Sequence, residues 1–340
     1  MAQVRFGIIG CGAIATLHHI PNLKRAPGAE VVAVADKDRR RAEEVASKFG
    51  IPQSYVDHKK LIDKADIDAL VVCTPTKYHA PAVLDALEEK HHVFCEKPMC
   101  LTLEEADKIT QSAAESNSRF MVGYNLRFTN LFQEVKEMVS RGEIGKPIQA
   151  ECSFCVPGPK KWPAASDFYH RKDLGGGALF DSGAHAIDLL RWIVGEVAGV
   201  SANITTENPE TDVDEAASLL LRFSTGTIGV LNASWTSPWP VVKVELYGSK
   251  GLLFAAFPEN VLSKGGIISL HKYRGIAFKE GLIKMEVKET GTMYQREILH
   301  FLDCIRSGAE PSVSAADGRA AVAVTVAAYE SAQKRREISV

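Results

Sequence analysis

Short apolar runs alternate with stretches of helical periodicity over the first 122 residues of the chain. Nearly continuous hydrophobic runs are typical of strands that are buried on both faces of a parallel sheet, and the stretches between them have the length of crossover helices. The alternation therefore predicts βαβ units. The predicted strands are 4–9, 30–35, 69–73, 92–95 and 120–122, and the predicted helices are 14–24, 39–49, 79–90 and 103–116.

The pattern changes from residue 123 onward. A helical stretch over 128–141 precedes an alternating segment at 148–156, and paired apolar runs flank glycine-containing turns at 224–226 and 248–251. Such pairs predict hairpins, and so a largely antiparallel sheet. We expect the fold class α/β, with an N-terminal Rossmann domain over 1–122 and an α+β domain with an open sheet over 123–340. The alanine-rich stretch 315–336 predicts a last helix that could pack on either domain.

Composition agrees with two globular domains and excludes several classes of protein. The chain has 340 residues, of which 46% are hydrophobic and 24% charged, as in ordinary globular proteins. A net charge of −2 offers no field for gathering nucleic acid or an anionic membrane. Seven cysteines do not suit a disulfide framework, and Cys152 and Cys155 would point to opposite faces of one strand. Because no apolar run has the length of a signal-peptide core or a membrane span, we expect a cytoplasmic protein.

The segment 10–15 fits the pattern G-x-G-x-x-A between the first predicted strand and the first predicted helix. Glycines in that position allow a tight turn and let a pyrophosphate approach the amides at the start of the helix. We therefore predict that Gly10, Gly12, Ala13 and Ile14 bind a dinucleotide.

Asp36 ends the second predicted strand. An acid there can accept hydrogen bonds from the ribose hydroxyls and repel a 2′-phosphate, which favours NAD. Lys37 and the basic run 39–41 could instead neutralise a phosphate, so NADP remains possible.

An acid and an imidazole follow a glycine run in the second half of the chain. If 179–194 is a helix, Asp181 and His185 lie on one face of it. Such a pair can move a proton, and glycines 175–177 would let a ligand approach the backbone. A histidine on an apolar helix is also a common core residue. A metal site built from Asp181, His185 and Asp188 is not favoured, because metal ligands rarely come from one helix face alone.

The segment 157–173 combines aromatic and cationic side chains, among them Trp162 and Tyr169. Aromatic rings beside cations suit a sugar that carries a carboxylate or phosphate. A solvated surface loop would have a similar composition, so both interpretations stay open.

Taken together, these motifs resemble the Gfo/Idh/MocA family, the relatives of glucose-fructose oxidoreductase and inositol dehydrogenase. The resemblance covers nearly the whole chain and implies a Rossmann domain followed by an α+β domain whose open sheet commonly forms the subunit interface. It implies that Lys97, Asp181 and His185 match the family's catalytic residues, and that the bond between Lys97 and Pro98 is often cis. The motifs that carry it are 10–15, Asp36, Thr74-Pro75 with His79, Glu96-Lys97-Pro98, 123–127, 175–177 and 181–188.

By the same resemblance, a further set of residues would line the nicotinamide end of the cofactor. This set comprises Thr74, Pro75, His79, Glu96, Lys97 and Asn125. Beside the substrate we expect Lys97, Arg127, Trp162, Tyr169, Asp181 and His185.

Removing a hydride from a secondary alcohol requires a base and a cation beside one oxygen. His185 is the favoured base, because an imidazole with its ordinary pKa of about 6.5 accepts a proton near neutrality, whereas a lysine with a pKa of about 10.4 is protonated. Lys97 would then stabilise the developing alkoxide. Asp181 would orient the substrate or help hold the imidazole. Lys97 as the base stays open, since burial lowers a lysine pKa.

The leading hypothesis is an NAD-dependent dehydrogenase, with NADP possible, that acts on a sugar, cyclitol or related polyol. A glycoside hydrolase that retains NAD and a non-enzymatic nucleotide-sensing regulator are the alternatives. The expected partners are a small-molecule substrate and further copies of the chain in a homodimer or homotetramer. We expect the oligomer because the strands around 217–223 and 227–231 carry apolar residues on both faces. We expect neither a nucleic acid, a membrane nor a metal to bind.

Overall fold

The computed structural model describes residues 3–162, 167–206, 208, 211–257, 265–272 and 282–340. The chain divides into two compact units, one of 1–124, 173–175 and 294–322, and one of 125–172, 176–293 and 323–340. The sequence-based division placed 123–340 in the second domain and left open which domain the helix 315–336 packs on, whereas the structure groups 294–322 with the first unit. The periodicity of a late helix reveals that it has an apolar face but not which core that face joins.

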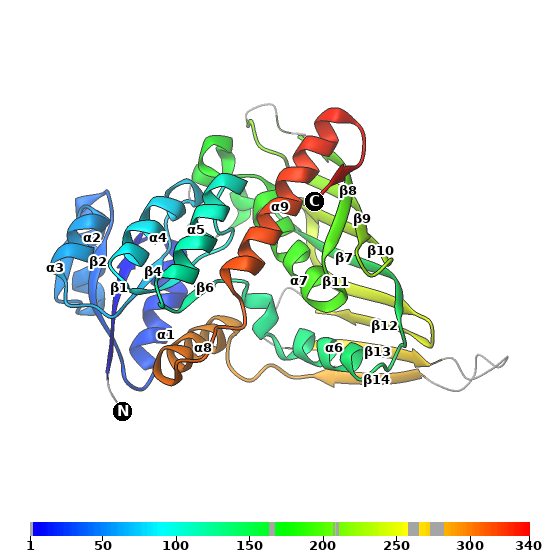
Figure 1. The fold of residues 1–340 in the computed structure, drawn as a ribbon, viewed down its shortest axis with the longest axis horizontal. Coiled ribbons are helices and arrows are strands. Elements are labelled where there is room, and N and C mark those ends of the chain that lie inside the picture. The colour runs from blue at the N-terminus through cyan, green and yellow to red at the C-terminus, as the bar shows by residue number, and fades with distance from the viewer. Residues whose placement is uncertain (1–2, 163–166, 207, 209–210, 258–264, 273–281) are drawn as a thin grey trace. The chain divides into compact units, whose positions relative to one another are not determined.

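Among the described residues, the first unit contains a six-stranded parallel sheet in the order β3-β2-β1-β4-β5-β6 (Figure 1). The order reverses between β1 and β4, and ligands of such sheets bind beyond the carboxyl ends of the strands at that point. The strands are β1 (Val4–Ile9), β2 (Ala29–Ala35), β3 (Gln53–Tyr55), β4 (Ala69–Val72), β5 (His92–Cys95) and β6 (Phe120–Val122).

Helices cover this sheet, and α3, α4 and α5 lie side by side (Figure 1). Local chemistry sets their ends: Asp38 caps α2 by accepting the Arg41 N–H, and Thr102 and Glu105 form a capping box at α5. The helical segments are η1 (Ala15–His19), α1 (Ile20–Arg25), α2 (Arg39–Phe49), α3 (His58–Lys64), η2 (Thr76–Tyr78), α4 (His79–Glu88), α5 (Leu103–Glu115) and α8 (Met293–Ser307).

In the described part of the second unit, nine strands form one sheet in the order β14-β13-β12-β11-β7-β10-β9-β8-β15. Its pairings are antiparallel except between β7 and β10, which confirms the predicted largely antiparallel sheet. The strands are β7 (Pro147–Pro157), β8 (Val197–Thr205), β9 (Ala216–Phe223), β10 (Ile228–Ser234), β11 (Thr236–Gly248), β12 (Gly251–Ala256), β13 (Gly266–Lys272), β14 (Leu282–Val287) and β15 (Ile338–Ser339).

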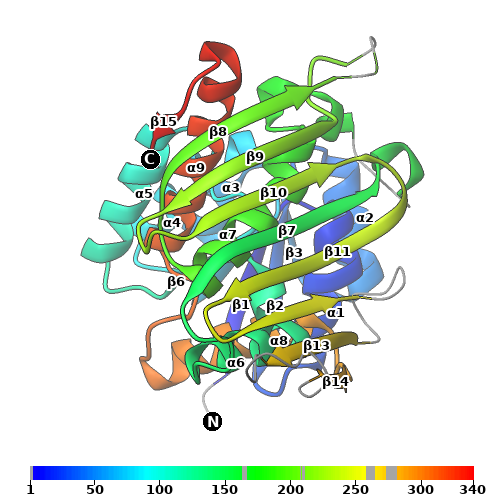
Figure 2. The same cartoon turned by 90° about the vertical axis from the view of Figure 1, so that its right-hand side faces the viewer.

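Helices of the second unit lie on one face of this sheet, where α7 contacts β7 and β10, and α6 contacts β12 and β13. The other face, seen in Figure 2, is open along β8, β9, β10, β7 and β11. The helical segments in chain order are η3 (Asn125–Phe128), α6 (Asn130–Ser140), η4 (Pro159–Lys161), η5 (Asp167–His170), η7 (Leu179–Gly183), α7 (Ala184–Val194) and α9 (Ala315–Lys334). The short η6 (Lys172–Leu174) spans a boundary between the units, since 173–175 belongs to the first. The last helix contributes 315–322 to the first unit and the rest to the second.

Apolar side chains stand on both faces of the sheet, as predicted. Along β9 the residues Leu219 and Leu221 are buried, while Leu220 between them is 53% exposed. Ile228 on β10 is 51% exposed and Val230, on the same face of that strand, is 36% exposed. The open face therefore carries hydrophobic surface that the helices of this unit do not cover.

All seven cysteines are free, including Cys152 and Cys155 on β7. No helix in the described ranges has the length and hydrophobicity needed to cross a membrane.

Candidate cofactor and substrate sites

The turn after β1 is shaped by two glycines with different roles. Gly10 has φ +95°, and a Cβ there would lie 2.7 Å from the Cys73 carbonyl carbon and 2.8 Å from the Thr74 nitrogen, so only glycine fits against the end of β4. A Cβ on Gly12 would meet nothing within 4 Å. The space over Gly12 fits the close approach of a dinucleotide phosphate to the amides at 12–14, where the helix of η1 and α1 begins.

Asp36 is held at this turn by backbone donors. Its Oδ2 accepts the Cys11 N–H and its Oδ1 accepts the Asp38 N–H, each at 2.9 Å. Only 8% of the side chain is exposed. Each carboxylate oxygen has a further lone pair, so the group can still accept hydrogen bonds from ribose hydroxyls. The geometry fits the predicted NAD site.

The basic run after Asp36 is paired with acids. Arg39 lies 3.9 Å from Glu43, Arg40 lies 2.7 Å from Glu44, and Arg41 lies 3.7 Å from Asp36 itself. These arginines have carboxylate partners before any phosphate is bound. Their pairing favours NAD over NADP.

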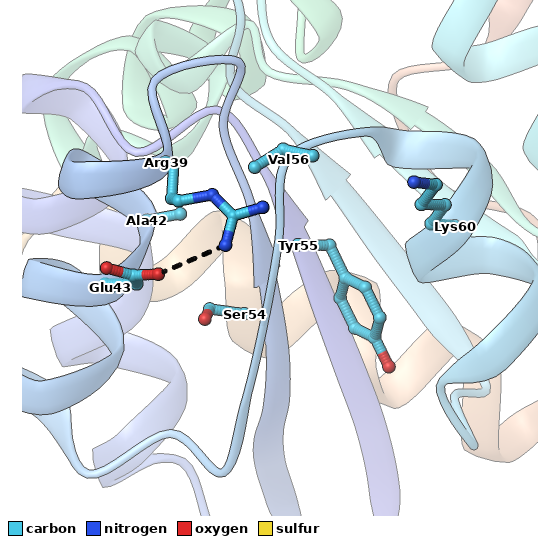
Figure 3. A pocket seen from close by; sticks show the side chains of 7 residues that line it. All are labelled: Arg39, Ala42, Glu43, Ser54, Tyr55, Val56 and Lys60. Atoms are coloured by element: carbon cyan, nitrogen blue, oxygen red, sulfur yellow. Dashed lines mark ion pairs between the residues drawn. The ribbon is translucent and has the colours of Figure 1, made fainter.

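A small pocket adjoins the Asp36 turn (Figure 3). It has a volume of about 170 Å³ between the start of α2, the end of β3 and α3, and the Asp36 N–H donates to the Tyr55 carbonyl in its wall. Figure 3 shows Arg39 turned toward Glu43. Arg39 and Lys60 give the pocket two cations that could approach an added phosphate. The lining residues are Arg39, Ala42, Glu43, Ser54, Tyr55, Val56 and Lys60.

Replacing Asp36 by serine is expected to shift cofactor preference from NAD toward NADP. The variant loses the charge that repels a 2′-phosphate and the acceptor for the ribose hydroxyls, while Arg39 and Arg41 remain. The ratio of the two Kd values, measured by fluorescence titration, should change by about tenfold or more, since one such charge contact corresponds to about 1.4 kcal/mol. Asp57→Ser, at the N-cap of α3, is the matched control and should leave the ratio unchanged. Tighter binding of NADP by the unmodified protein would contradict this prediction.

His79 joins the segments that follow β4 and β5. It is buried, and its two ring nitrogens lie 2.9 Å from the Pro98 carbonyl and 2.8 Å from the Thr74 carbonyl. Burial lowers the pKa of His79 despite these carbonyl contacts. The ring thus holds together the segments that contain Thr74 and Pro98.

Thr74 lies just before η2 but does not cap it. Pro75 rather than Thr74 is the N-cap of η2, and no side chain caps it. The Thr74 Oγ1 is buried and has no hydrogen-bond partner. A buried hydroxyl in that state fits a contact with a bound ligand.

Glu96 and Lys97 follow β5 at the same sheet edge. The Lys97 N–H donates to Glu96 Oε2 at 3.1 Å, and Glu96 Oε1 lies 2.6 Å from His19 Nε2. Burial raises the pKa of Glu96, but the hydrogen bond and charge of His19 and the charge of Lys97 outweigh it and hold that pKa below its usual value. The Lys97–Pro98 bond is cis, as the family resemblance implies.

The glycine run packs against protein in each position, contrary to the expectation that it admits a ligand. A Cβ on Gly175 would lie 2.6 Å from Leu101 Cδ2 and 2.8 Å from Thr76 Cβ. A Cβ on Gly176 would collide with the Tyr169 carbonyl oxygen, and one on Gly177 with the Asp214 carboxylate. These glycines permit close chain packing. Sequence could not separate the two uses, because both require the absence of a side chain.

The predicted helix over 179–194 is confirmed, with a π-helical first part, η7, that contains Asp181. Asp181 accepts the Ser182 hydroxyl at 3.3 Å, and Ser182 Oγ accepts the Trp235 Nε1–H at 3.2 Å. π-Helical turns inside helices are frequent at functional sites. The structure therefore ties Asp181, through Ser182, to an aromatic side chain that the sequence analysis missed.

His185 lies one turn further on, in α7. It is buried, and its ring stacks on Phe154 of β7 with centroids 5.5 Å apart and an angle of 10°. This stacking fixes the plane of the imidazole. A defined ring plane is what a residue that exchanges a proton with a substrate needs.

Trp162 and Tyr169 pack around Trp235. The Trp162 ring centroid lies 5.1 Å from Tyr169 and 5.8 Å from Trp235, with rings nearly perpendicular. Together with Ala178 and Val213 they form an apolar cluster beside the segment that leads to Asp181. The two predicted substrate-binding aromatics thus also support η7. Trp235 directly follows β10, and an aromatic residue at a strand end was the signal that could have identified it.

Arg127 is placed differently from the substrate contact that was predicted. Its guanidinium Nε donates to Asp188 Oδ2 at 2.8 Å and its Nη2 donates to Oδ1, with 5% of the Arg127 side chain and 2% of the Asp188 side chain exposed. This bidentate buried pair supports a structural role. Asn125 lies in the same element, η3, and is buried with its Oδ1 lacking a hydrogen-bond partner, which fits a ligand contact.

Comparison with known proteins identifies the family. Residues 4–124 match the model described as "Oxidoreductase family, NAD-binding Rossmann fold", and residues 132–254 match the "GFO/IDH/MocA C-terminal domain". The chain is a member of the GFO/IDH/MocA family. The fold class, the NAD cofactor and the assignment as an oxidoreductase are thereby confirmed.

The similarity to relatives in the GFO/IDH/MocA family covers nearly the whole chain. The chain is 30% identical to the myo-inositol 2-dehydrogenase of Thermotoga maritima over 98% of both chains. It is 30% identical to the scyllo-inositol 2-dehydrogenase (NAD(+)) of Bacillus subtilis over 97% of this chain and 94% of that one. A crystal structure of a probable dehydrogenase from Thermotoga maritima has a TM-score of 0.81 and 29% identity over 99% of this chain and 98% of that one.

Proposed function

We propose that this protein oxidises a secondary alcohol of a sugar, cyclitol or related polyol. The observation that carries the proposal is the full-length similarity to inositol dehydrogenases, together with a turn at 10–12 and an Asp36 carboxylate that fit NAD. The aromatic cluster of Trp162, Tyr169 and Trp235 beside η7 also suits the apolar faces of a ring-shaped polyol.

The chain's own residues would each supply one part of the chemistry. Lys97 supplies a cation that stabilises the developing alkoxide. His185 accepts the hydroxyl proton, and Asp181 orients the substrate from its position beside Ser182. NAD, when bound, supplies the hydride acceptor. If Lys97 rather than His185 takes the proton, the imidazole becomes the group that orients the substrate.

A substrate panel tests the proposal. Inositols, pyranoses, pentoses and uronic acids are incubated with NAD or NADP, and formation of reduced cofactor is followed by absorbance. At least one polyol should be oxidised with NAD. Glycoside cleavage that requires NAD but gives no net reduction would instead identify the hydrolase alternative. Absence of both reactions throughout the panel would contradict the proposal.

We also propose that the open sheet face pairs two copies of the chain. Leu220 on β9 and Val230 on β10 are direct cross-strand partners and are 53% and 36% exposed. Burying such residues face to face in an isologous interface removes apolar surface from water.

The oligomeric state is therefore expected to depend on this face. Light scattering should give a dimer or tetramer of the 37.0 kDa chain, and Leu220→Lys with Val230→Lys should shift it toward the monomer. Leu17→Lys, at an exposed leucine of the first unit, should have no such effect. A monomeric mass for the unmodified protein at micromolar concentration would rule out the pairing.

A further inference from the structure

A buried polar cluster in the first unit lies outside the roles assigned so far. It consists of His19 at the end of η1, Glu96 after β5 and Glu297 in α8, which are 0%, 6% and 0% exposed. One nitrogen or oxygen from each lies within 4.8 Å of those of the other two. Two carboxyl groups and an imidazole are thus enclosed together beside the amide of Lys97.

Aromatic packing holds α8 against this cluster. Tyr294 at the start of α8 stacks on His18 with centroids 3.9 Å apart, and Phe301, two turns further on, contacts Phe94 at 5.8 Å. His19 in turn meets Phe94 edge-on at 5.1 Å. Figure 1 shows α8 alongside α1. Glu297 is fully buried in this packing.

The two carboxyl groups have different surroundings. Glu96 lies 2.6 Å from His19 Nε2 and accepts the Lys97 N–H, so a negative charge on it is compensated. Both Glu297 oxygens are buried without a hydrogen-bond partner. A carboxylate there would lack any donor and would repel Glu96, whereas an uncharged acid costs much less to bury and does not repel Glu96. Burial and the charge of Glu96 accordingly raise the pKa of Glu297 well above its usual value.

The distance between His19 and Glu96 fits a hydrogen bond better than two ligands of one metal ion. Ligands about 2.1 Å from one tetrahedral ion lie about 3.4 Å from one another. The 2.6 Å between His19 Nε2 and Glu96 Oε1 is a hydrogen-bond distance. These two atoms share a proton.

We propose that Glu297 is an uncharged carboxylic acid in the folded protein, and that its packing within 4.8 Å of Glu96, together with the His19 hydrogen bond, keeps Glu96 where that carboxylate accepts the Lys97 amide hydrogen. Glu297 and His19 are then positioning residues for Lys97. The kinetic part rests on the proposed function of Lys97, whereas the protonation state of Glu297 does not depend on it.

Stability should consequently depend on pH in a defined direction. Glu297 keeps its proton in the folded protein, whereas the unfolded chain releases it above the ordinary glutamate pKa of about 4.3. The folded state is therefore favoured less as pH rises from about 4.3 toward the raised pKa of Glu297. Several titratable groups of this region act on Glu297 or Glu96 or are affected by their charge. They are His18, His19, Cys73, His79, Cys95 and Lys97.

Glu297→Gln tests the protonation state directly, because glutamine has the shape of the uncharged acid. The full-length variant should fold, and its urea midpoint should fall less than the wild-type midpoint between pH 5 and pH 8. Infrared difference spectra at pH 7 should show a carboxylic-acid carbonyl band that the variant lacks. Glu44→Gln, at an exposed carboxylate paired with Arg40, is the control and should change neither readout. The proposal would be overturned if Glu297→Gln failed to fold or if the band were absent from the wild-type protein. It would also be overturned if the wild-type protein bound one equivalent of metal and the variant bound none.

Kinetics test the positioning role. Glu297→Met removes the acid at similar length and should lower kcat about tenfold while the KM of the polyol and the Kd of NAD change less than threefold. Glu297→Gln should recover most of the lost turnover. Wild-type kcat in Glu297→Met would end the positioning role. If Lys97→Ala itself retained full turnover, the proposed function would fail, and the infrared and stability measurements would still decide the state of Glu297.

Discussion

Alanine at Lys97 or at His185 is expected to lower kcat by about two to four decades while NAD binding survives. The first substitution removes the cation that stabilises the alkoxide, and the second removes the group that accepts the hydroxyl proton. Steady-state kinetics on the best polyol of the panel and fluorescence titration with NAD measure the two effects separately. Lys108→Ala, at an exposed lysine paired with Glu104, and His271→Ala, at an exposed histidine of β13, are the controls and should stay near wild type.

Lys97→Arg separates the two possible roles of the lysine. Arginine keeps the positive charge but cannot act as a base near neutrality. If Lys97 serves as a cation, this variant should retain more turnover than Lys97→Ala, and the pH dependence of kcat/KM should persist. Equal loss in both lysine variants with a mild effect of His185→Ala would assign the base to Lys97. Near wild-type turnover in both alanine variants would remove both residues from the mechanism.

Asp188→Ala is expected to lower the free energy of unfolding of the second unit by about 3–5 kcal/mol. The substitution leaves the Arg127 guanidinium buried without the carboxylate that it contacts through two hydrogen bonds. It also removes a negative charge that lies 4.0 Å from a second cation, Arg191. Urea unfolding followed by circular dichroism measures the change. Asp107→Ala removes the partner of Arg319 in a half-exposed pair and should cost no more than about 1 kcal/mol.

The same pair distinguishes a structural Arg127 from a substrate-binding one. Replacing both residues with leucine should cost less than Asp188→Ala alone, because no charge is left unpaired. A loss below about 1 kcal/mol for Asp188→Ala, combined with a raised KM in Arg127→Met, would restore the substrate contact that the sequence suggested.

Much of the first unit was determined by the sequence itself. The strands β1, β5 and β6 and the helix α2 have the predicted bounds, because fully buried parallel strands and capped amphipathic helices leave strong local patterns. The short edge strand β3 and helix α3 were missed, since three residues at a sheet edge carry little periodicity. The turn at 10–15 and Asp36 were recognisable because their chemistry is confined to a short stretch next to the first two strands.

Only the tertiary structure decided roles that depend on partners distant in the chain. The glycines at 175–177 face other protein segments, Arg127 meets Asp188, and Trp235 supports Ser182. In the sequence, Glu297 is indistinguishable from the other polar residues of an amphipathic helix. Only the packing of α8 in the first unit encloses it with Glu96 and His19. Periodicity reports which face of an element is buried, but the charge and hydrogen-bond state of a buried group are set by neighbours that the fold brings together.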